Sequence, residues 1–300
     1  MSFDLISPSQ QDALEALALY RFLTVKQFVR LGISKSESSL RNNTLHDLKS
    51  RRYKSPVTGK TGNAIVAADL GRWQKLPFVH HLTEVGADLL ADLWKVAPSE
   101  VPYPVGGAQF GKQFFHRIAQ VDFHIAVRLW AKANDAEIHL ADMDFDKIGA
   151  QRTGGMVAKT KVQIDQHSFI IPDGIFGLVA NDTPFLFALE VHDETDTGYI
   201  VRQLMRHGNA LMNGSLAKKY HQETSNFVLS VMEETRHTSN DAANEEAAQK
   251  RVKAVQTRML RQPYFQSFQQ GYFFNTIHQV RRDIREGWTT ADGVEVRPFG

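Results

Sequence analysis

Two carboxylates and one imidazole in this sequence have the types and spacing of a small metal site. Asp173 directly follows a proline, and Glu190 and His192 stand two positions apart in an otherwise apolar run. Carboxylate oxygens with one imidazole suit Mg²⁺ or Mn²⁺. Such an ion activates water and stabilises charge on a phosphate during hydrolysis. The alternative is structural: Asp173 caps the turn beside Gly174, and Glu190 pairs with an arginine.

A β-hairpin is the element that would bring these side chains together. The breakers NDTP separate the strand-like runs GIFGLVA and FLFALEV, so we expect a four-residue loop. In that register Ala180 faces Phe185, and Asp173 faces His192. Directly opposed residues point to one face of a sheet, and Glu190 joins that face because side chains alternate. A slip of one residue would move Asp173 to the other face.

The long helix expected at 114–133 adds a third acidic candidate. Asp122 lies beside its apolar stripe. We expect Asp122 either to point into the site, with His116 supporting it, or to pair with Arg117 or Arg128 at the surface. The expected stripe consists of Ile118, Val121, Ile125 and Leu129.

A break rich in proline and glycine, at 97–113, divides the chain of 300 residues into two expected domains. Beyond it, strands and helices alternate, which predicts an α/β (α+β) fold with a mixed sheet. The expected strands are 136–145, 161–171, 174–180, 185–191, 226–233 and, as the last one, 272–277. The expected helices after the hairpin are 198–212 and 245–260.

The part before the break reads as three short helices followed by strands. Ser9 and Thr24 are the expected N-caps of the first two helices, and Leu40, Leu45 and Leu48 face inward from the third. A short helix, a tight turn and a longer helix form a helix-turn-helix pattern. A later strand and a helix capped by Thr83 complete a resemblance to a winged helix-turn-helix domain, with Gly59 and Gly62 at the tip of the wing.

Basic residues cluster on the third helix and the wing, with only Asp47 opposing them. A recognition helix in the major groove and a wing on the backbone both require positive charge, and Asn42, Asn43 and Thr44 could read base edges. A solvated helix or a protein-binding winged helix is the alternative. The cluster consists of Arg41, Lys49, Arg51, Arg52, Lys54 and Lys60.

The runs IIPDGIF and FLFALEVHDET resemble the PD-(D/E)xK core of the restriction-endonuclease-like fold. Pro172-Asp173 supplies its first half and Glu190-Val191-His192 its second, with His192 in place of the lysine. More specifically, the chain resembles the replication-relaxation family of plasmid and mobile-element proteins. The resemblance covers ALALYRFLTVKQFVRLG, HHLTEVGADLL, HRIAQVDFHIAVRL and PDG…ALEVHDET. That family tends to carry an acid where His192 stands.

The resemblance implies a winged helix-turn-helix domain at 1–96, a linker at 97–113 and a nuclease-like domain at 114–300. It implies a DNA-binding protein of a plasmid or other mobile element that acts in replication, conjugation (mobilisation) or DNA relaxation. A relaxase-like endonuclease would nick DNA with Mg²⁺ or Mn²⁺ held by Asp173 and Glu190, and with His192 and Asp122 as further catalytic candidates. The missing lysine favours the alternative, which is a non-catalytic initiator, accessory factor or transcription regulator with a degenerate nuclease-like domain.

Double-stranded DNA is the implied partner, with other replication or mobilisation proteins, and a homodimer stays open. In the resembling folds the helix after the second motif borders the DNA backbone. Arg202 and Arg206, one turn apart on the helix expected at 198–212, are therefore candidates for phosphate contacts. A solvated helix face is the alternative reading of this pair.

Composition narrows the chemistry further. The chain contains no cysteine, which excludes disulfides and thiolate metal sites. Its net charge is only +2, so any DNA surface must come from local clustering. The absence of HExxH and of two histidines separated by one residue argues against zinc proteases and two-histidine relaxases. With no signal peptide, membrane-length apolar run or organic-cofactor motif, we expect a cytoplasmic protein that does not contact a membrane.

Overall fold

The structure is a computed structural model that describes residues 6–68, 77–104, 113–148, 156–222, 225–233 and 240–300. The chain forms two compact units, Met1–Phe114 and Phe115–Gly300. The division falls at the end of the predicted linker, of which residues 105–112 lie outside the described residues. Across the described ranges, no helix combines the length and the hydrophobicity needed to cross a bilayer.

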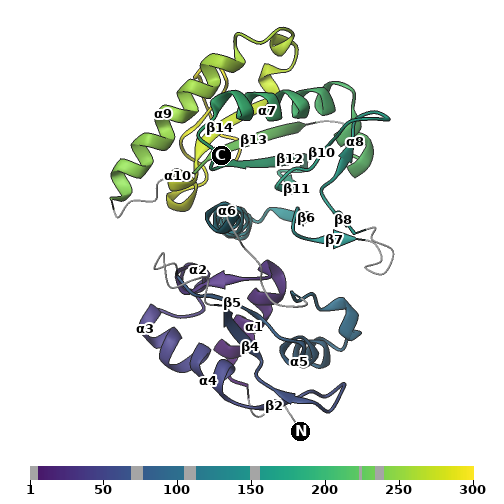
Figure 1. Cartoon of the computed structure of the whole chain (residues 1–300), viewed down its shortest axis with the longest axis vertical. Coiled ribbons are helices and arrows are strands. Elements are labelled where there is room, and N and C mark those ends of the chain that lie inside the picture. The colour runs from purple at the N-terminus through teal and green to yellow at the C-terminus, as the bar shows by residue number, and fades with distance from the viewer. Residues whose placement is uncertain (1–5, 69–76, 105–112, 149–155, 223–224, 234–239) are drawn as a thin grey trace. The chain divides into compact units, whose positions relative to one another are not determined.

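The first unit surrounds small antiparallel sheets with short helices (Figure 1). One sheet has the strand order β1-β5-β4, and β2 pairs with β3 in a separate hairpin. The helices are α1 (Pro8–Tyr20), α2 (Val25–Arg30), α3 (Glu37–Ser39), the π-helical turn η2 (Leu40–Thr44), α4 (Leu45–Ser50), α5 (Glu84–Trp94) and the 3-10 turn η3 (Pro98–Glu100). The strands are β1 (Leu23–Thr24), β2 (Tyr53–Lys54), β3 (Thr61–Gly62), β4 (Ile65–Ala68) and β5 (Val79–Leu82).

Side-chain caps determine where these helices begin. Thr24 and Thr83 cap α2 and α5, as predicted. The predicted cap at Ser9 is wrong, because Ser7 caps α1 and forms a reciprocal capping box with Gln10. The third predicted helix runs continuously through α3, η2 and α4, and its leucines at positions 40, 45 and 48 are fully buried as predicted.

The second unit is built on a seven-stranded mixed sheet with the order β16-β15-β14-β13-β12-β11-β6. The central strands β12, β13 and β14 are parallel, and the outer pairs are antiparallel. These strands are β6 (Glu137–Met143), β11 (Gly174–Ala180), β12 (Thr183–His192), β13 (Asn226–Met232), β14 (Tyr272–Thr276), β15 (Trp288–Thr289) and β16 (Glu295–Val296). Two small hairpins pair β7 (Lys147–Ile148) with β8 (Val157–Ala158), and β9 (Val162–Gln163) with β10 (Phe169–Ile170).

The mixed sheet confirms the predicted α/β class. Two details were wrong: the strand expected at 161–171 is the hairpin of β9 and β10, and β14 is followed by two further strands. The helices of this unit are α6 (Phe114–Ala133), α7 (Thr197–Met212), α8 (Ser215–Tyr220), α9 (Asp241–Met259) and α10 (Ile277–Arg282), with 3-10 turns η6 (Phe265–Ser267) and η7 (Gln269–Gly271).

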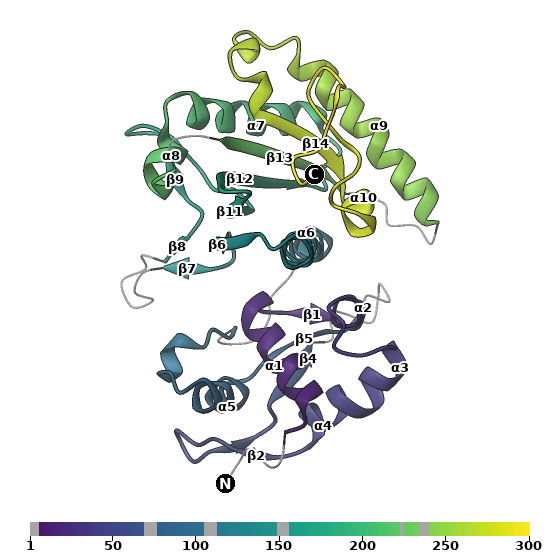
Figure 2. The same cartoon turned by 180° about the vertical axis from the view of Figure 1, so that it is seen from behind.

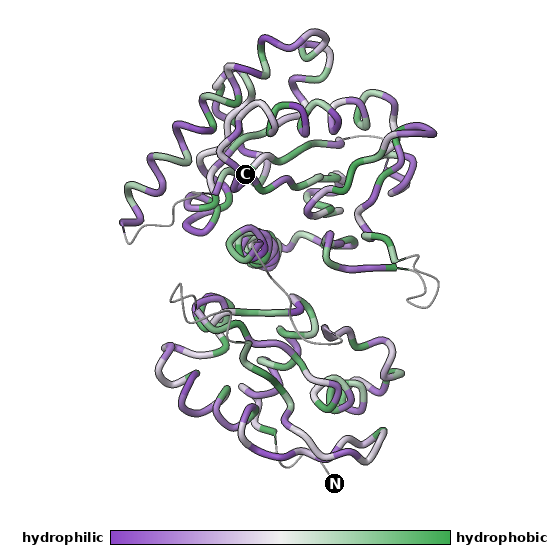
Figure 3. The backbone as a smooth tube through the Cα atoms, viewed as in Figure 1, coloured by the Kyte–Doolittle hydropathy of each residue, from purple (hydrophilic) through white to green (hydrophobic). Residues whose placement is uncertain are grey.

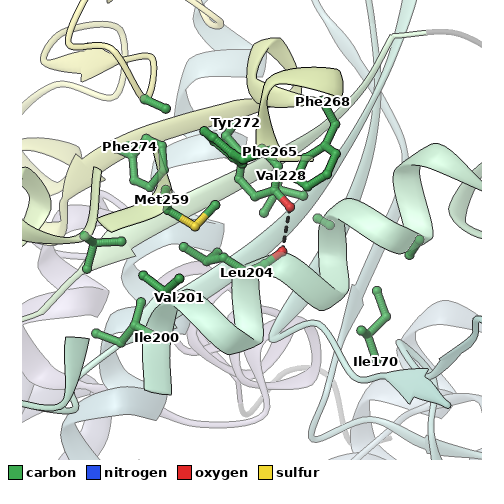
Figure 4. Close-up of a cluster of buried hydrophobic side chains, with 14 of the residues drawn as sticks. Ile170, Ile200, Val201, Leu204, Val228, Met259, Phe265, Phe268, Tyr272 and Phe274 are labelled. Carbon is green, nitrogen blue, oxygen red and sulfur yellow. Dashed lines mark hydrogen bonds between the residues drawn. The ribbon is translucent and has the colours of Figure 1, made fainter. Parts of the chain in front are cut away.

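Helices cover both faces of this sheet (Figures 1 and 2). On one face, Ile200 and Leu204 of α7 and Val252 of α9 pack against Ala188 and Tyr272. The Tyr272 hydroxyl donates a 2.6 Å hydrogen bond to the Leu204 carbonyl, which satisfies the polar tip of this buried ring (Figure 4). Hydropathy follows the same division, with apolar central strands and a largely hydrophilic α9 (Figure 3).

The other face packs against α6 and α10. Phe123 and Trp130 of α6 contact a buried cluster that includes Phe176 and Phe187 of the sheet. Leu129, which was expected in the apolar stripe, is 36% exposed, so the predicted stripe is wrong at that position. The two large aromatic side chains determine which side of α6 faces the sheet, because each buries more apolar area than an aliphatic residue.

Candidate functional site

The hairpin that carries the candidate acids is tighter than predicted. Ala180 pairs with Thr183, and Gly174 pairs with Leu189. Asn181 and Asp182 form a two-residue turn, and both have positive φ values, of 48° and 59°. Such turns match the twist of a hairpin, and Asn and Asp tolerate this conformation. The expected four-residue loop, with Ala180 opposite residue 185, is therefore wrong.

The register differs from the prediction by two residues, so Asp173 aligns with Glu190 rather than with His192. A shift of two preserves the direction of each side chain. Glu190 and His192 alternate with the residues that face α6, and they follow Ala188 on the face that α7 covers. The Asp173 carboxylate lies beside this strand, where its Oδ2 accepts a 2.7 Å hydrogen bond from the Val191 N–H.

Asp173 is held by a histidine from α6. His116 Nε2 lies 3.0 Å from Asp173 Oδ1, and His116 Nδ1 lies 3.6 Å from Asp193 Oδ1. Burial lowers the pKa of His116, but the charge of Asp173 and the hydrogen bond that His116 donates to it outweigh burial and raise that pKa to about 11. Burial likewise opposes ionisation of Asp173, yet His116 keeps the pKa of this carboxyl below its ordinary value. The pair is therefore ionised at neutral pH.

A second acid lies at the edge of this pair. The amide nitrogen of Gln120 contacts both His116 Nε2, at 3.1 Å, and Asp144 Oδ1, at 3.3 Å. Burial, followed by the charge of Asp173, raises the pKa of Asp144 to about 6. Neither Gln120 nor Asp144 was singled out by sequence reasoning, because their strand and helix meet only in the folded unit.

Glu190 is held from the other helical layer. Its Oε1 lies 2.6 Å from His207 Nε2, and its Oε2 accepts a 2.5 Å hydrogen bond from Gln203. Both partners come from α7, one turn apart, and neither Glu190 nor His207 has appreciable exposure. Burial raises the pKa of Glu190 to about 7, although the charge of His207 opposes this shift. The spacing of Gln203 and His207 on the buried side of α7 was the signal that could have revealed them.

His192 takes the position of the missing lysine and is fully buried. Among the described residues, neither of its ring nitrogens finds a hydrogen-bond partner, and its Nδ1 lies 4.0 Å from Glu194 Oε2. Burial lowers the pKa of His192 to about 3, so the ring is neutral. The hydroxyl of Ser230, opposite Glu190 on the next strand, is likewise buried without a partner. Such unsatisfied atoms each cost about 1–3 kcal/mol, which makes this the strained point of the site.

A shared ion does not fit the observed arrangement of these side chains. Both oxygens of Asp173 and Oε2 of Glu190 accept hydrogen bonds, whereas Oε1 of Glu190 lies 2.6 Å from His207 Nε2 without a hydrogen bond from the described residues. Within the ranges that the structure describes, no group of three or more His, Asp or Glu side chains is placed to hold a metal. An ion between the two carboxylates would require His116 or His207 to turn away, while His192 could then offer a ring nitrogen.

Asp122 belongs to a different network. Its Oδ2 accepts a 2.7 Å hydrogen bond from Arg281 of α10, and Arg281 also contacts Glu233 at 3.0 Å. His278 lies 3.8 Å from the same Glu233 carboxylate. The structure therefore brings Asp122 to a cation from the far end of the chain, and it places Asp173 and Glu190 in separate pairs with histidines.

The candidate DNA-binding residues of the first unit form a strip that is exposed except at the half-buried Lys49 and the buried Thr44. Arg41, Asn42 and Asn43 lie on η2, whose π-helical geometry is often found at functional positions. Thr44 is buried and contacts Ser9, so the expectation that it reads bases is wrong. A groove of about 670 Å³ runs beside this strip and is lined by Lys26, Arg41, Asn42, His46, Lys49 and His80, among others.

The remaining basic candidates lie at the end of α4 and on the β2–β3 hairpin. Arg52 donates to the Thr61 carbonyl and to Asn63, both at 3.2 Å, which anchors the hairpin to the end of the helix. Lys60 forms an exposed ion pair of 3.2 Å with Glu84. Arg51 and Lys54 are exposed beside them.

In the second unit, Arg202 and Arg206 are exposed on the outer side of α7. They lie on the opposite side of the helix from His207 and Leu204, which are buried. No protein family, curated protein or solved structure matches this chain. Its function must therefore be inferred from the residues and their geometry.

Proposed function

We propose that this chain is a DNA-binding protein of a plasmid or other mobile element, of the replication-relaxation type, that acts in replication or mobilisation. The observation that carries the proposal is the exposed basic strip of the first unit. It joins one continuous helical segment, residues 37–50, to a two-stranded hairpin. Helix and hairpin are the two elements with which a winged helix-turn-helix domain contacts the groove and the backbone of a duplex.

The residue types on this strip suit both kinds of contact. Asn42 and Asn43 are exposed in the middle of the helical segment, where amide side chains can pair with adenine edges. Arg51 and Lys54 follow at its end and on the hairpin, where cations pair with phosphates. The strip therefore separates residues that can read sequence from residues that can set affinity.

The topology of the second unit supports a restriction-endonuclease-like fold. Helix α6 precedes the antiparallel strands β6, β11 and β12, and α7 then leads to β13, which is parallel to β12. The Pro-Asp and Glu-x-His elements fall at the start of β11 and near the end of β12. This order matches the motif order expected from the resemblance, with His192 again in the place of lysine.

The two histidine–carboxylate pairs, His116 with Asp173 and His207 with Glu190, favour a second unit that holds or organises DNA rather than one that cleaves it. His116 supplies positive charge beside Asp173, and His207 occupies the space beside Glu190 where a divalent ion would bind. The full burial of Glu190 and His192 also separates them from solvent. A non-catalytic initiator or accessory factor is consistent with both observations.

Metal-dependent nicking is a second candidate function, favoured by the alignment of Asp173 with Glu190 and by the unpartnered ring of His192. If His116 or His207 turned outward, these residues could hold Mg²⁺ or Mn²⁺, which would activate water for hydrolysis. Under this candidate, Mn²⁺ raises the melting temperature, because an ion that binds the native state at a hundred times its Kd adds about 2.7 kcal/mol. Asp173→Asn with Glu190→Gln should then abolish that increment.

Mapping of the DNA bound by the chain in its native host tests the main proposal. We expect enrichment at a small number of sites, which should disappear in an Asn42→Ala, Asn43→Ala variant that still folds. Uniform background signal for the wild type would contradict the proposal. A nicking assay on supercoiled plasmid with Mn²⁺, compared with the Asp173→Asn, Glu190→Gln variant, separates the two candidate functions.

A further inference from the structure

A second concentration of positive charge lies on the helices that cover the sheet of the second unit. The sequence has no acidic residue from Thr197 to Gln222, and none from Ala247 to Arg282. These two stretches contain α7, α8 and the last two thirds of α9. The whole chain is nearly neutral, with a net charge of +2, but these two stretches carry basic residues and no acidic ones.

The cations of this layer point outward from two neighbouring helices. Helices α7 and α9 pack against each other on the same face of the sheet (Figure 1). Their exposed cations, together with Arg261 just after the end of α9, are called here the α7–α9 basic face and are Arg202, Arg206, Lys253, Arg258 and Arg261. Of these residues, Arg206, Lys253 and Arg261 have no carboxylate of the described chain within 4.0 Å.

Two guanidinium groups converge at the start of α7. A methyl group placed on Gly198 would lie 3.1 Å from an oxygen of Asp196, 3.3 Å from a nitrogen of Arg258 and 3.5 Å from a nitrogen of Arg202. Asp196 offsets part of this charge, at 3.8 Å from Arg202, and Arg258 donates to the Thr197 hydroxyl at 2.6 Å. Two like charges this close favour an additional anion, and a guanidinium pairs with phosphate through two parallel hydrogen bonds.

We infer that the α7–α9 basic face binds the sugar–phosphate backbone of a second duplex DNA segment, independently of the first unit. Lys253 and Arg258 are five residues apart on α9, which corresponds to about 7.5 Å along the helix axis, and Arg261 lies two residues after the end of this helix. Phosphates along one strand follow at about 3.4 Å along the duplex axis, so Lys253 and Arg258 span about two of them. One chain could then hold two duplex segments together, one on each unit.

The exposed side chains beside these cations include both small and large residues. Ala254 and Thr257, between Lys253 and Arg258, are too small to insert into a bilayer, whereas Leu260, between Arg258 and Arg261, is 43% exposed. A test with lipid vesicles therefore accompanies the test with DNA. The identification of the polyanion as duplex DNA rests on the proposed function, but the location of the face does not.

A two-duplex capture assay on the full chain tests this inference. One random-sequence duplex is immobilised, protein is added, and capture of a second, fluorescent duplex is measured. We expect the wild type to capture the second duplex. In the Arg206→Ala, Arg258→Ala, Arg261→Ala variant, the fluorescence of captured duplex should fall at least tenfold. The matched control is Lys132→Ala, Arg285→Ala, Arg297→Ala, which removes three exposed cations elsewhere in the same unit and should capture normally.

The outcomes separate this inference from the proposed function. If the α7–α9 variant captures the second duplex as well as the wild type does, or if the control variant fails equally, the inference is wrong. If Arg51→Ala with Arg52→Ala leaves duplex binding intact while the α7–α9 variant loses it, the proposed first-unit surface is wrong and this inference stands. Binding of the wild type to phosphatidylserine-containing vesicles, without any capture of duplex, would also overturn it.

Discussion

Glu190 Oε1 and His207 Nε2 lie 2.6 Å apart in the fully buried layer between the sheet and α7. Gln203 completes this arrangement by donating to the second carboxylate oxygen. Two neighbouring acids, Asp173 and Glu190, are thereby each matched with a histidine from a different helix. His116 links α6 to the residue that precedes β11, and His207 links α7 to β12, so the site joins both helical layers of the unit.

Because burial raises the pKa of Glu190 to about 7 from an ordinary value of 4.5, its protonated form is favoured in the folded chain. Its contribution to stability is therefore full below about pH 4.5 and is lost as the pH rises through 7. We expect the wild type to lose up to about 3 kcal/mol relative to Glu190→Gln across this range. Denaturant unfolding of both proteins at several pH values measures this, with Glu137→Gln as an exposed control; a constant difference would contradict it.

The ion pair of His116 and Asp173 should lose stability as the pH falls through the acidic range, whereas Glu190 contributes most there. The lowered pKa of Asp173 contributes stability above its ordinary value of 3.8, and the raised pKa of His116 contributes fully below 6.5 and less as the pH approaches about 11. The coupling free energy between the two residues should thus be largest between the pH values that equal these two ordinary pKa values. We expect His116→Gln alone to cost about 3 kcal/mol.

A double-mutant cycle of His116→Gln and Asp173→Asn measures this coupling. The cycle is repeated inside the favourable pH window and well above it. Equal coupling energies in both conditions would mean that charge is not what joins the pair. A larger coupling at the higher pH would contradict the raised pKa of His116.

Arg281 is the shared cation of Asp122 and Glu233, and it joins α10 to α6. Arg281→Met should destabilise the chain by about 2–3 kcal/mol, because it leaves two largely buried acids facing each other. This figure is already reduced for the 33% exposure of the arginine side chain. Thermal unfolding is the readout: adding Asp122→Asn and Glu233→Gln should restore most of the loss, whereas Arg285→Met, at an exposed ion pair, should have little effect. No rescue would show that packing of the arginine, rather than its charge, matters.

Local patterns predicted much of the fold. The bounds of β11 and α6 were predicted correctly, and Thr24 and Thr83 cap their helices, because these features depend on neighbouring residues. The hairpin register was wrong because both residues at its turn take positive φ, which counting breakers could not distinguish from a longer loop.

The partners of the acids depended on long-range packing, which a sequence pattern does not encode. Asp122 and Arg281 are 159 positions apart, and His116 and Asp173 are 57 apart. The orientation of α6 decides which of its side chains reach the sheet, and it follows from aromatic packing with residues near the C-terminal end. Of the α7–α9 basic face, the sequence singled out only Arg202 and Arg206; its other cations lie on or just after the helix expected at 245–260, where no pattern marked them.

Duplex binding as a function of salt concentration tests the central claim most directly. The wild type and Arg51→Ala with Arg52→Ala are titrated against a duplex from a mapped site, by fluorescence anisotropy at several salt concentrations. Each lost phosphate contact should lower the magnitude of the log–log slope by about 0.9, so the folded variant should bind more weakly and with a slope smaller by about 1.8. An unchanged slope and affinity in a folded variant, or no duplex binding by the wild type at low salt, would contradict the account.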